Sequence, residues 1–435
     1  MKLYSTNNQS YVVTLEEAVM NALAPDRGLY MPVEMPSLNE EFLNNIHAHS
    51  FQEIAFEISQ TLLHDSVPLE ELKAIINGAI TFDAPVIKLN DQIGILELFH
   101  GPSLAFKDFG AQFMSRLMGH FNKDKGQELL ILVATSGDTG GAVAAGFLNV
   151  PGINVAILYP SGKVSALQEK QLTTLGKNIK AFEIEGTFDD CQRMVKTAFL
   201  DAEITDQLNL SSANSINIAR LIPQSFYYAE AYKQIKSINK PCCFVVPSGN
   251  FGNLTAGLIA KKMGIPIERF IAATNVNNIV PEYLRNGKYN PKTSIATLSN
   301  AMDVGNPSNF VRMMELYNYS HEAIIEDVSG AWFDDQTTEA ALLELNEKYN
   351  YTIDPHGAVG YAAAKEYLKE HPDHFTVILE TAHPSKFKPD VERILGNEID
   401  VPERLAKLSH LEKHAVLLKN DYSLFKENIL NHYAH

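Results

Sequence analysis

"FHGPSLAFKDFGAQF", residues 99–113, places one lysine among bulky apolar side chains. Phe106 and Phe109 flank Lys107, and the apolar residues that follow at four-residue spacing predict a helix beginning near it. Most lysines are exposed surface groups. Here the aromatic rings would desolvate the ammonium and a helix N-terminus would repel it, so both effects lower the pKa of Lys107. A partly neutral lysine is a nucleophile that can form a Schiff base with an aldehyde.

The composition of the chain narrows the classes of partner that this protein can have. The chain has 435 residues, 45% of them hydrophobic, and a formal net charge of −16. That length suits two or three domains, and the acidic balance argues against nucleic acid or an anionic membrane as a partner. The three cysteines have no zinc-site spacing, no other metal motif is visible, and sparse cysteine fits a reducing compartment. With neither a secretory signal nor a membrane-spanning run, we expect a cytoplasmic protein.

The organisation of the chain changes near residue 90. From about 90 to 390, short apolar runs alternate with helical patterns, as in "ELLILVA" before "GGAVAAGFL" and "CFVVPSGNFGN" before "LTAGLIAKKM". This alternation predicts parallel α/β sheets, whose ligands bind in loops beyond the carboxyl ends of the strands. Residues 1–85 are predicted to form a mainly helical N-terminal domain, and residues 396–435 a helical tail.

One such loop is glycine-rich. In "VVPSGNFGN", residues 245–253, Gly249 and Gly252 allow the backbone to approach a ligand closely. Successive N–H groups at the start of the following helix form an anion site that suits a phosphate. An ordinary strand-to-helix turn capped by Asn253 explains the same residues.

A second loop carries hydroxyl groups. In "LVATSGDTGGAVAAG", residues 132–146, the side chains of Thr135, Ser136 and Thr139 and the N–H groups at a helix start suit a carboxylate. An ordinary capped helix is the alternative interpretation.

Two further segments offer polar groups. "SSANSINIAR", residues 211–220, brings Ser215, Asn217 and Arg220 together as a candidate phosphate clamp, although an arginine in a surface ion pair is the simpler explanation. "ILETAHPSKF", residues 378–387, ends a predicted strand at Thr381, whose hydroxyl could bond a ring nitrogen without supplying a full charge.

Together these motifs resemble those of a known family. In chain order, "SLAFKDFGAQF", "ATSGDTG", "NSINIAR", "VPSGNFGN" and "TAHPSKF" are similar to the signatures of threonine synthases, which belong to the fold-type II pyridoxal 5′-phosphate (PLP) enzymes of the tryptophan synthase β family. The openings "MKLYSTN" and "APDRGLYMP" resemble that family's N-terminal domain. The resemblance implies a catalytic core over 86–395 with two parallel-sheet α/β subdomains, the smaller around 110–215.

The resemblance also implies an activity and a site. The activity is the conversion of O-phospho-L-homoserine and water to L-threonine and phosphate, by γ-elimination of phosphate and β-addition of water. Lys107 matches the catalytic lysine that holds PLP as a Schiff base. The other positions that match cofactor contacts are Asp138, Gly249, Asn250, Phe251, Gly252, Asn253 and Thr381. The positions that match substrate contacts are Thr135, Ser136, Thr139, Lys163, Ser215, Asn217 and Arg220.

Two rival functions stay open. A PLP-dependent lyase of the serine or threonine dehydratase kind shares the fold, but its substrates carry no phosphate, so the "NSINIAR" segment favours threonine synthase. A non-catalytic relative that binds a phospho-ligand is the other alternative, and we would expect it to have lost Lys107. The expected partner is the small-molecule substrate, and the chain is expected to be a monomer or a homodimer.

Overall fold

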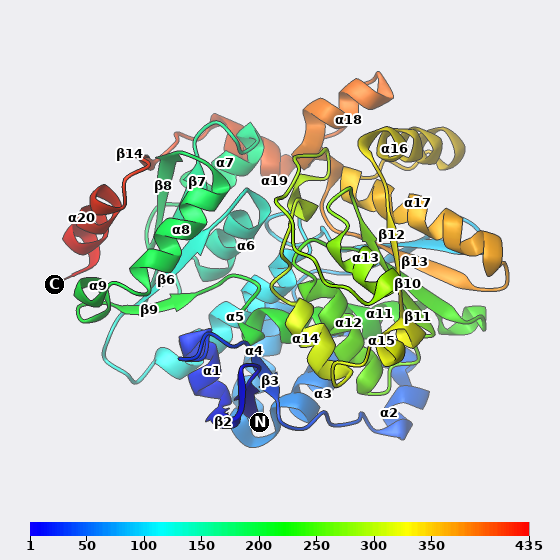
Figure 1. Ribbon diagram of the computed structural model, residues 1–435, viewed down its shortest axis with the longest axis horizontal. Helices are drawn as coiled ribbons and strands as arrows, with labels where there is room; N and C mark the ends of the chain where they lie inside the picture. The colour runs from blue at the N-terminus through cyan, green and yellow to red at the C-terminus, as the bar shows by residue number, and fades with distance from the viewer. Residues whose placement is uncertain (435) are drawn as a thin grey trace.

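The larger of the two α/β sheets contains the strands that precede two of the predicted ligand loops. The computed structural model describes residues 1–434 (Figure 1). In spatial order this sheet contains β12 (Val328–Trp332), β11 (Arg269–Thr274), β10 (Cys242–Pro247), β13 (Phe375–Glu380), β5 (Ile93–Glu97) and β4 (Val86–Lys88). All neighbours are parallel except β4, which pairs antiparallel with β5. This confirms the parallel α/β fold that the alternating pattern predicts.

Helices cover both faces of this sheet, which is why its central strands are continuous apolar runs. Every residue of β10 and β13 is buried. Alternate side chains point to opposite faces, so Val245 joins the core under one layer of helices and Phe244 joins the core on the other. The helices around this sheet are α11 (Phe226–Ile235), α12 (Gly252–Lys262), α13 (Ile279–Asn286), α14 (Phe310–Leu316), α15 (His321–Asp327), α16 (Asp335–Tyr349), α17 (Pro355–Glu370) and α18 (Lys388–Leu395).

The smaller sheet is entirely parallel. It contains, in spatial order, β14 (Ala415–Lys419), β8 (Ile179–Glu185), β7 (Ile153–Pro160), β6 (Leu129–Ala134) and β9 (Asn209–Ser212). Its helices are α6 (Asp138–Phe147), α7 (Ala166–Thr173), α8 (Phe188–Ala198) and α9 (Ala202–Thr205). Two connecting helices, α5 (Lys107–Asn122) and α10 (Ile218–Leu221), complete the core.

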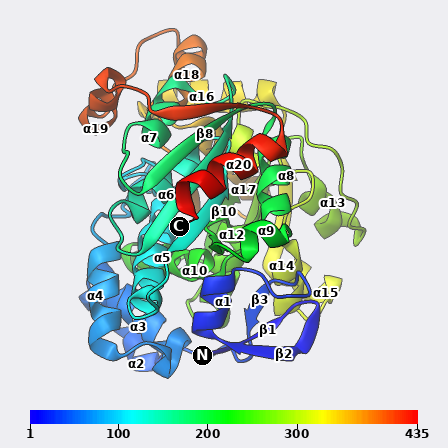
Figure 2. The same ribbon diagram turned by 90° about the vertical axis from the view of Figure 1, so that its left-hand side faces the viewer.

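The tail corrects one prediction. We expected helix throughout 396–435, but between α19 (Glu403–Ala406) and α20 (Tyr422–Tyr433) the chain forms β14, which pairs parallel with β8. Figure 2 shows this C-terminal segment running back across the smaller sheet. The strand has an apolar sequence, AVLLK, but it is only five residues long and only Leu418 is buried, so the prediction did not separate it from the helices around it.

The N-terminal region is also less helical than predicted. It has the expected helices α1 (Leu15–Asn21), α2 (Glu40–Asn44), α3 (Phe51–Leu63) and α4 (Leu69–Ala79), and α1 begins with the predicted capping box of Thr14 and Glu17. In addition, β2 (Asn8–Thr14), β1 (Lys2–Ser5) and β3 (Tyr30–Pro32) form an antiparallel sheet that the sequence analysis missed. Most of β2 faces solvent, so no apolar alternation marks it.

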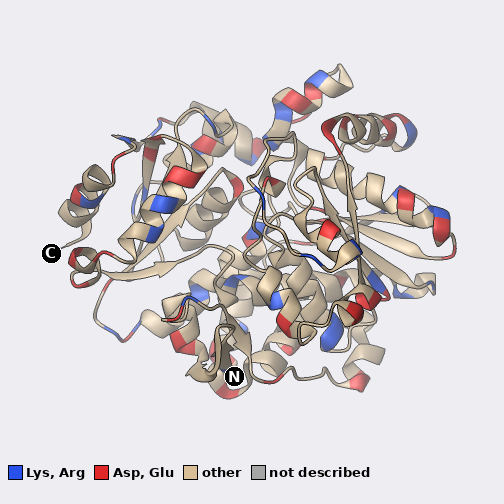
Figure 3. Cartoon of the chain, viewed as in Figure 1, with Lys and Arg blue, Asp and Glu red and all other residues tan. Residues whose placement is uncertain are grey.

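The charged side chains are distributed over the whole molecule. Figure 3 shows acidic and basic residues interspersed on the outer helices and loops of both sheets. Within residues 1–434, no helix combines the length and apolar character needed to cross a bilayer. The same residues contain no group of three or more His, Cys, Asp or Glu side chains arranged to hold a metal ion.

Candidate active site

Lys107 lies at the carboxyl-end edge of the larger sheet. It is the first residue of α5, and the backbone N–H of the preceding residue, Phe106, donates to the carbonyl oxygen of Thr381 at 2.9 Å. A bridge between Ala105 and Ala382 reinforces this link to the end of β13. Thr381 is buried and directly follows the strand, so the fold brings the predicted lysine and the predicted ring-nitrogen partner to the same edge.

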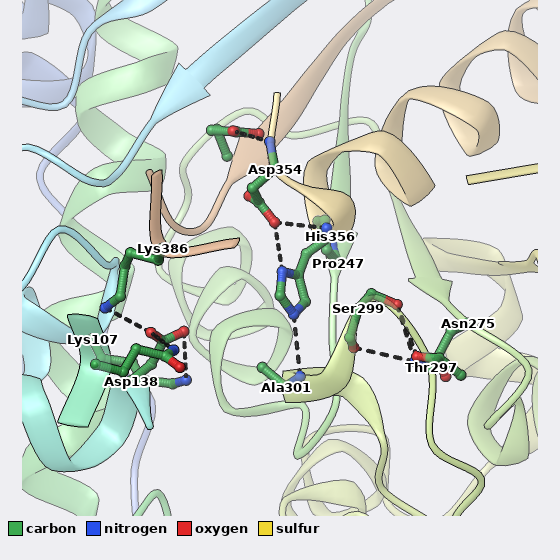
Figure 4. A network of polar contacts seen from close by, with 12 residues as sticks. Lys107, Asp138, Pro247, Asn275, Thr297, Ser299, Ala301, Asp354, His356 and Lys386 are labelled. Carbon is green, nitrogen blue, oxygen red and sulfur yellow. Dashed lines mark hydrogen bonds and ion pairs between the residues drawn. The ribbon is translucent and has the colours of Figure 1, made fainter. Parts of the chain in front are cut away.

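The smaller sheet contributes Asp138 to the same place. Asp138 opens α6, just beyond the carboxyl end of β6, and its Oδ2 lies 3.7 Å from Lys107 Nζ. Its Oδ1 lies 2.6 Å from the Nζ of a second lysine, Lys386, and accepts a 2.8 Å hydrogen bond from Gln168. Figure 4 shows both lysines directed at this carboxylate. The site therefore lies between the carboxyl edges of the two sheets, where open α/β folds bind ligands.

Burial and charge shift the protonation of this group. Burial lowers the pKa of Lys107 below its usual value, and the charges of Lys386 and Arg220 lower it further, while Asp138 opposes them. Burial alone would raise the pKa of Asp138, but the two ammonium groups outweigh it and hold that pKa below its usual range. The sequence analysis predicted that aromatic neighbours would lower the pKa of Lys107, and the Phe106 ring does lie 5.6 Å from Nζ. The structure adds the two nearby cations as a further cause.

The loop 249–253 has the form of an anion cradle. Phe251 adopts a left-handed conformation (φ 60°) that turns the chain into α12. Within residues 1–434, the backbone N–H groups of residues 249–253 have no acceptor in the protein. Five free donors in succession at the start of an 11-residue helix suit a phosphate, so the loop fits the phosphate of PLP. The N-cap of α12 is Phe251 and not Asn253, which is the second residue of the helix. The Asn253 side chain donates to the Pro247 carbonyl and accepts from the Ser248 hydroxyl and the Leu254 N–H.

A second segment supports this cradle from outside. The carbonyl oxygen of Asn250 accepts from Asn309 N–H at 3.2 Å, and its side chain accepts from Ser308. Gly249 is packed so tightly on this segment that an added Cβ would lie 2.5 Å from the carbonyl oxygen of Ala301. A side chain at position 249 would therefore displace the loop. This steric limit, and not only backbone freedom, explains why the position holds a glycine.

Ala301 is itself fixed by a buried histidine. Its N–H donates to His356 Nε2 at 3.2 Å, and His356 Nδ1 lies 2.5 Å from Asp354 Oδ1 (Figure 4). Asp354 and His356 are both buried. This dyad was not predicted as part of the site, and it holds the wall against which the phosphate loop rests.

The hydroxyl-rich loop after β6 is only partly available. The Thr135 hydroxyl is buried and accepts the N–H groups of Gly137 and Gly140, at 3.0 and 2.9 Å. Thr135 therefore shapes the turn. Ser136 is exposed and Thr139 half-buried, and both lie beside Asp138 at the helix start.

In the segment 215–220, the Asn217 side chain is fully hydrogen-bonded to the backbone, whereas Arg220 keeps a donor without a partner within residues 1–434. The Asn217 side chain donates to the carbonyls of Val19 and Ser212 and caps α10, so its amide is fully used by the backbone. Arg220 is buried, and one guanidinium nitrogen donates to Ala213 while Nε has no partner among the described residues. Burial lowers the pKa of Arg220 to about 10. Its charge lowers the pKa of Lys107, and it packs against Gly110 of α5, where an added Cβ would lie 2.7 Å from Nε.

Arg312, on α14, is a second buried cation that the sequence analysis missed. It is fully buried and donates to the carbonyls of Tyr30 and Ile216 at 3.1 and 2.7 Å and to the Asn309 side chain at 2.8 Å. Burial without a carboxylate lowers its pKa to about 9. It ties the N-terminal sheet, the 215–220 segment and the wall of the phosphate cradle together. No local signal distinguishes it from a surface arginine.

Two further lysines differ from expectation: Lys386 was not predicted as part of the site, and Lys163 was predicted as a substrate contact. Lys386 lies in "TAHPSKF" just after the buried strand β13, and that context was the only available signal. The Lys163 ammonium is exposed after β7 and forms no ion pair with the described residues. Lys163, like Ser136, is a predicted substrate residue that the fold leaves exposed.

Comparisons with known proteins agree along the whole chain. A family model described as pyridoxal-phosphate dependent enzyme matches residues 85–381. Two models described as threonine synthase, N terminus and C-terminal, match residues 2–80 and 357–429. Threonine synthase of Escherichia coli (strain K12) is 44% identical over 433 residues, covering 99% of this chain and 100% of the relative.

Solved structures give the same result. The crystal structure of threonine synthase from Escherichia coli superposes with a TM-score of 0.93 at 43% identity and covers 99% of this chain and 100% of its own. The structure of PLP-bound threonine synthase from Brucella melitensis has a TM-score of 0.93 at 34% identity and covers both chains completely.

Proposed function

This chain belongs to the threonine synthase family of PLP-dependent enzymes, and from that premise we propose the roles of its residues. It is a lyase of threonine biosynthesis that converts O-phospho-L-homoserine and water to L-threonine and phosphate. The observation that carries the residue roles is that the fold offers two anion-receiving regions: the free N–H groups of 249–253, just beyond the carboxyl end of β10, and the buried guanidinium of Arg220, which is close enough to Lys107 to lower its pKa. A dehydratase-like lyase, whose substrate has no phosphate, would have no use for the second.

The cofactor site consists of Lys107, the 249–253 loop, Thr381 and Asp138. Lys107 would hold PLP covalently as a Schiff base, the free N–H groups of the loop would bind its phosphate, and the Thr381 hydroxyl would bond the ring nitrogen. When bound, PLP supplies the electron sink that stabilises negative charge next to the substrate's amino group. A hydroxyl at Thr381 does not hold the ring nitrogen protonated as a carboxylate would.

Proton transfers are assigned to Lys107. After the substrate releases it, Nζ accepts the proton from substrate Cα, so that the C–H bond breaks and an N–H bond forms. Nζ must give up that proton before it can remove one from Cβ, which then lets phosphate leave from Cγ with the electrons of the C–O bond. The same ammonium would return the Cβ proton to Cγ and so open Cβ to water, whose hydroxyl adds there while the released phosphate takes its proton; Cα finally regains a proton. Cα, Cβ and Cγ must therefore all lie within reach of the same amine. Lys107 can meet this requirement because it is the first residue of α5 and its neighbours fix its backbone.

The substrate's phosphate is assigned to Arg220, with Ser215 beside it. A buried guanidinium binds phosphate strongly because little water competes. Asn217 would act indirectly, by capping α10 and so placing Arg220. Thr135 would shape the turn that receives the substrate carboxylate, and Ser136 and Thr139 would bind that carboxylate. Lys163 would have to move to reach the phosphate, so its role depends on closure of the smaller domain over the substrate.

Two further assignments complete the proposal. We place the protein in the cytoplasm, because its three cysteines are buried and free, which fits a reducing compartment. We expect a monomer or a homodimer, which sedimentation of the purified chain would distinguish.

The proposal is tested by absorbance and product analysis. The purified chain with PLP should show a visible band that shifts when O-phospho-L-homoserine is added, with phosphate and threonine formed in equal amounts. Lys107→Ala should lose the band of lysine-bound cofactor. If Lys107→Ala keeps the wild-type band, the assignment of Lys107 is wrong; if wild type shows the band but releases no phosphate, the substrate assignment is wrong.

A further inference from the structure

Lys386 is a fully buried lysine paired with Asp138, the carboxylate that faces Lys107, and the mechanism above does not use it. We propose that Lys386 is a positioning residue that takes up the carboxylate of Asp138 and thereby leaves the amine of Lys107 without a counterion of its own. The inference rests on the proposed function, since it concerns the readiness of Lys107 to act as a nucleophile and base. It goes beyond that function by assigning the residue that makes Lys107 reactive.

The geometry distinguishes the two lysines. Lys386 Nζ lies 2.6 Å from Asp138 Oδ1 and donates to the carbonyl oxygen of Ser103 at 2.8 Å. Lys107 Nζ lies 3.7 Å from the other oxygen of Asp138, which is beyond hydrogen-bond distance. The Lys386 side chain is fully buried, whereas 17% of the Lys107 side chain is exposed. Asp138 is therefore engaged by Lys386, with Gln168 as its second donor.

The charges that face Lys107 do not balance. Asp138 from α6 is the one carboxylate directed at it, while Lys386 from the segment after β13 and Arg220 from α10 are both cationic. Asp108, the next residue on α5, is turned toward the N–H of Ser103, which donates to it at 2.8 Å. One carboxylate shared between two ammonium groups in a buried site neutralises the nearer one, and the other then favours the uncharged state.

The same arrangement would serve the reaction. A neutral Lys107 attacks the cofactor's aldehyde carbon, and after release it can accept a proton at Nζ, whereas an ammonium can do neither. If Asp138 were free to pair with Lys107, the pair would hold a proton on Nζ. Lys386 weakens this pairing, because its ammonium holds Oδ1 of Asp138 at 2.6 Å while Oδ2 stays 3.7 Å from Lys107 Nζ.

The test measures the proton affinity of Lys107 directly. The full-length chain, freed of PLP, is pulsed with acetic anhydride from about pH 6 to about pH 10, and acetylation of the Lys107 peptide is followed by mass spectrometry. In Lys386→Met, Asp138 becomes available to Lys107, so we expect its pKa to rise and its labelling near neutral pH to fall about ten-fold. Lys386→Arg, which keeps a cation at Asp138, should label like wild type.

A second variant covers the case in which Lys386→Met does not fold. Asp138→Asn removes the carboxylate and leaves only cations facing Lys107, so its pKa should fall and its labelling near neutral pH should rise. The matched control is Lys233→Met, which removes another poorly exposed lysine paired with a carboxylate, Glu230 at 2.6 Å, away from the site. It should leave the Lys107 profile unchanged.

Opposite shifts in the two variants support the proposal. If a folded Lys386→Met has the wild-type Lys107 profile, or if Asp138→Asn shifts it in the same direction as Lys386→Met, the proposal is overturned. A merely structural lysine would change thermal stability without moving this profile. Threonine formation by wild type is measured separately, so failure of the proposed function would be recognised without affecting the labelling result.

Discussion

Replacing Gly249 by alanine is the sharpest test of the phosphate cradle. The new Cβ would lie 2.5 Å from the carbonyl oxygen of Ala301 and 3.0 Å from Met302 Cα, both backbone atoms. Ala301 cannot easily retreat, because its N–H is bound to the His356–Asp354 dyad. The loop that carries the free N–H groups must therefore move instead, away from the position that suits a phosphate.

The size of the effect follows from the donors displaced. Loss of one charge-assisted hydrogen bond costs about 1.5–3 kcal/mol, so we expect the Kd for PLP to rise about 10- to 150-fold. Overpacking should in addition lower the free energy of unfolding by about 1–3 kcal/mol. The assay is an absorbance titration of the cofactor-free full chain with PLP, alongside urea unfolding of the same samples.

A second glycine provides the control. Gly119 lies in α5, and its added Cβ would approach only a side-chain atom, Val150 Cγ1, at 3.2 Å. Gly119→Ala should bind PLP with wild-type affinity and be as stable or more so, because alanine favours a helix. If Gly249→Ala is folded and binds PLP within about two-fold of wild type, the N–H groups of this loop do not hold the phosphate.

Three further outcomes are expected. Arg220→Met should raise the KM for O-phospho-L-homoserine far more than the Kd for PLP, as measured by steady-state kinetics and cofactor titration; equal losses would indicate misfolding. Arg312→Met should lower the free energy of unfolding by about 3 kcal/mol in urea, because buried carbonyls of Tyr30 and Ile216 lose a charged donor; a loss under about 1 kcal/mol would contradict that role. Burial and the charge of Arg404 lower the pKa of His383 to about 4, so the unfolded chain binds a proton on this residue before the folded chain does. Stability should therefore fall as the pH drops from about 6.5 to about 4, by at most about 3 kcal/mol, and His383→Gln should reduce this dependence in unfolding measured across that range.

Local patterns in the sequence predicted most of the core. The run "ELLILVA" became β6, and the aromatic spacing after Lys107 became α5, because a buried strand and an amphipathic helix each leave a short-range signature. The elements that were missed, β1 to β3 and β14, are short or solvent-facing strands. β3 and β14 pair with strands that are farther away in the chain, whereas β1 and β2 form a hairpin whose outer strand is almost entirely exposed, so apolar alternation does not mark it.

The residues of the site divide in the same way. The sequence alone determined the family and singled out Lys107 and the glycine-rich loop as site candidates, because a covalent attachment point and a phosphate cradle require particular residue types at fixed local spacing. Only the tertiary structure decided that Lys386 and Asp138 form an ion pair and that the Asn217 side chain bonds backbone groups. It also decided that Arg312 is buried without a carboxylate partner among the described residues. Charge neutralisation and desolvation depend on distance and burial, and the fold sets both by bringing together segments that are far apart in the chain.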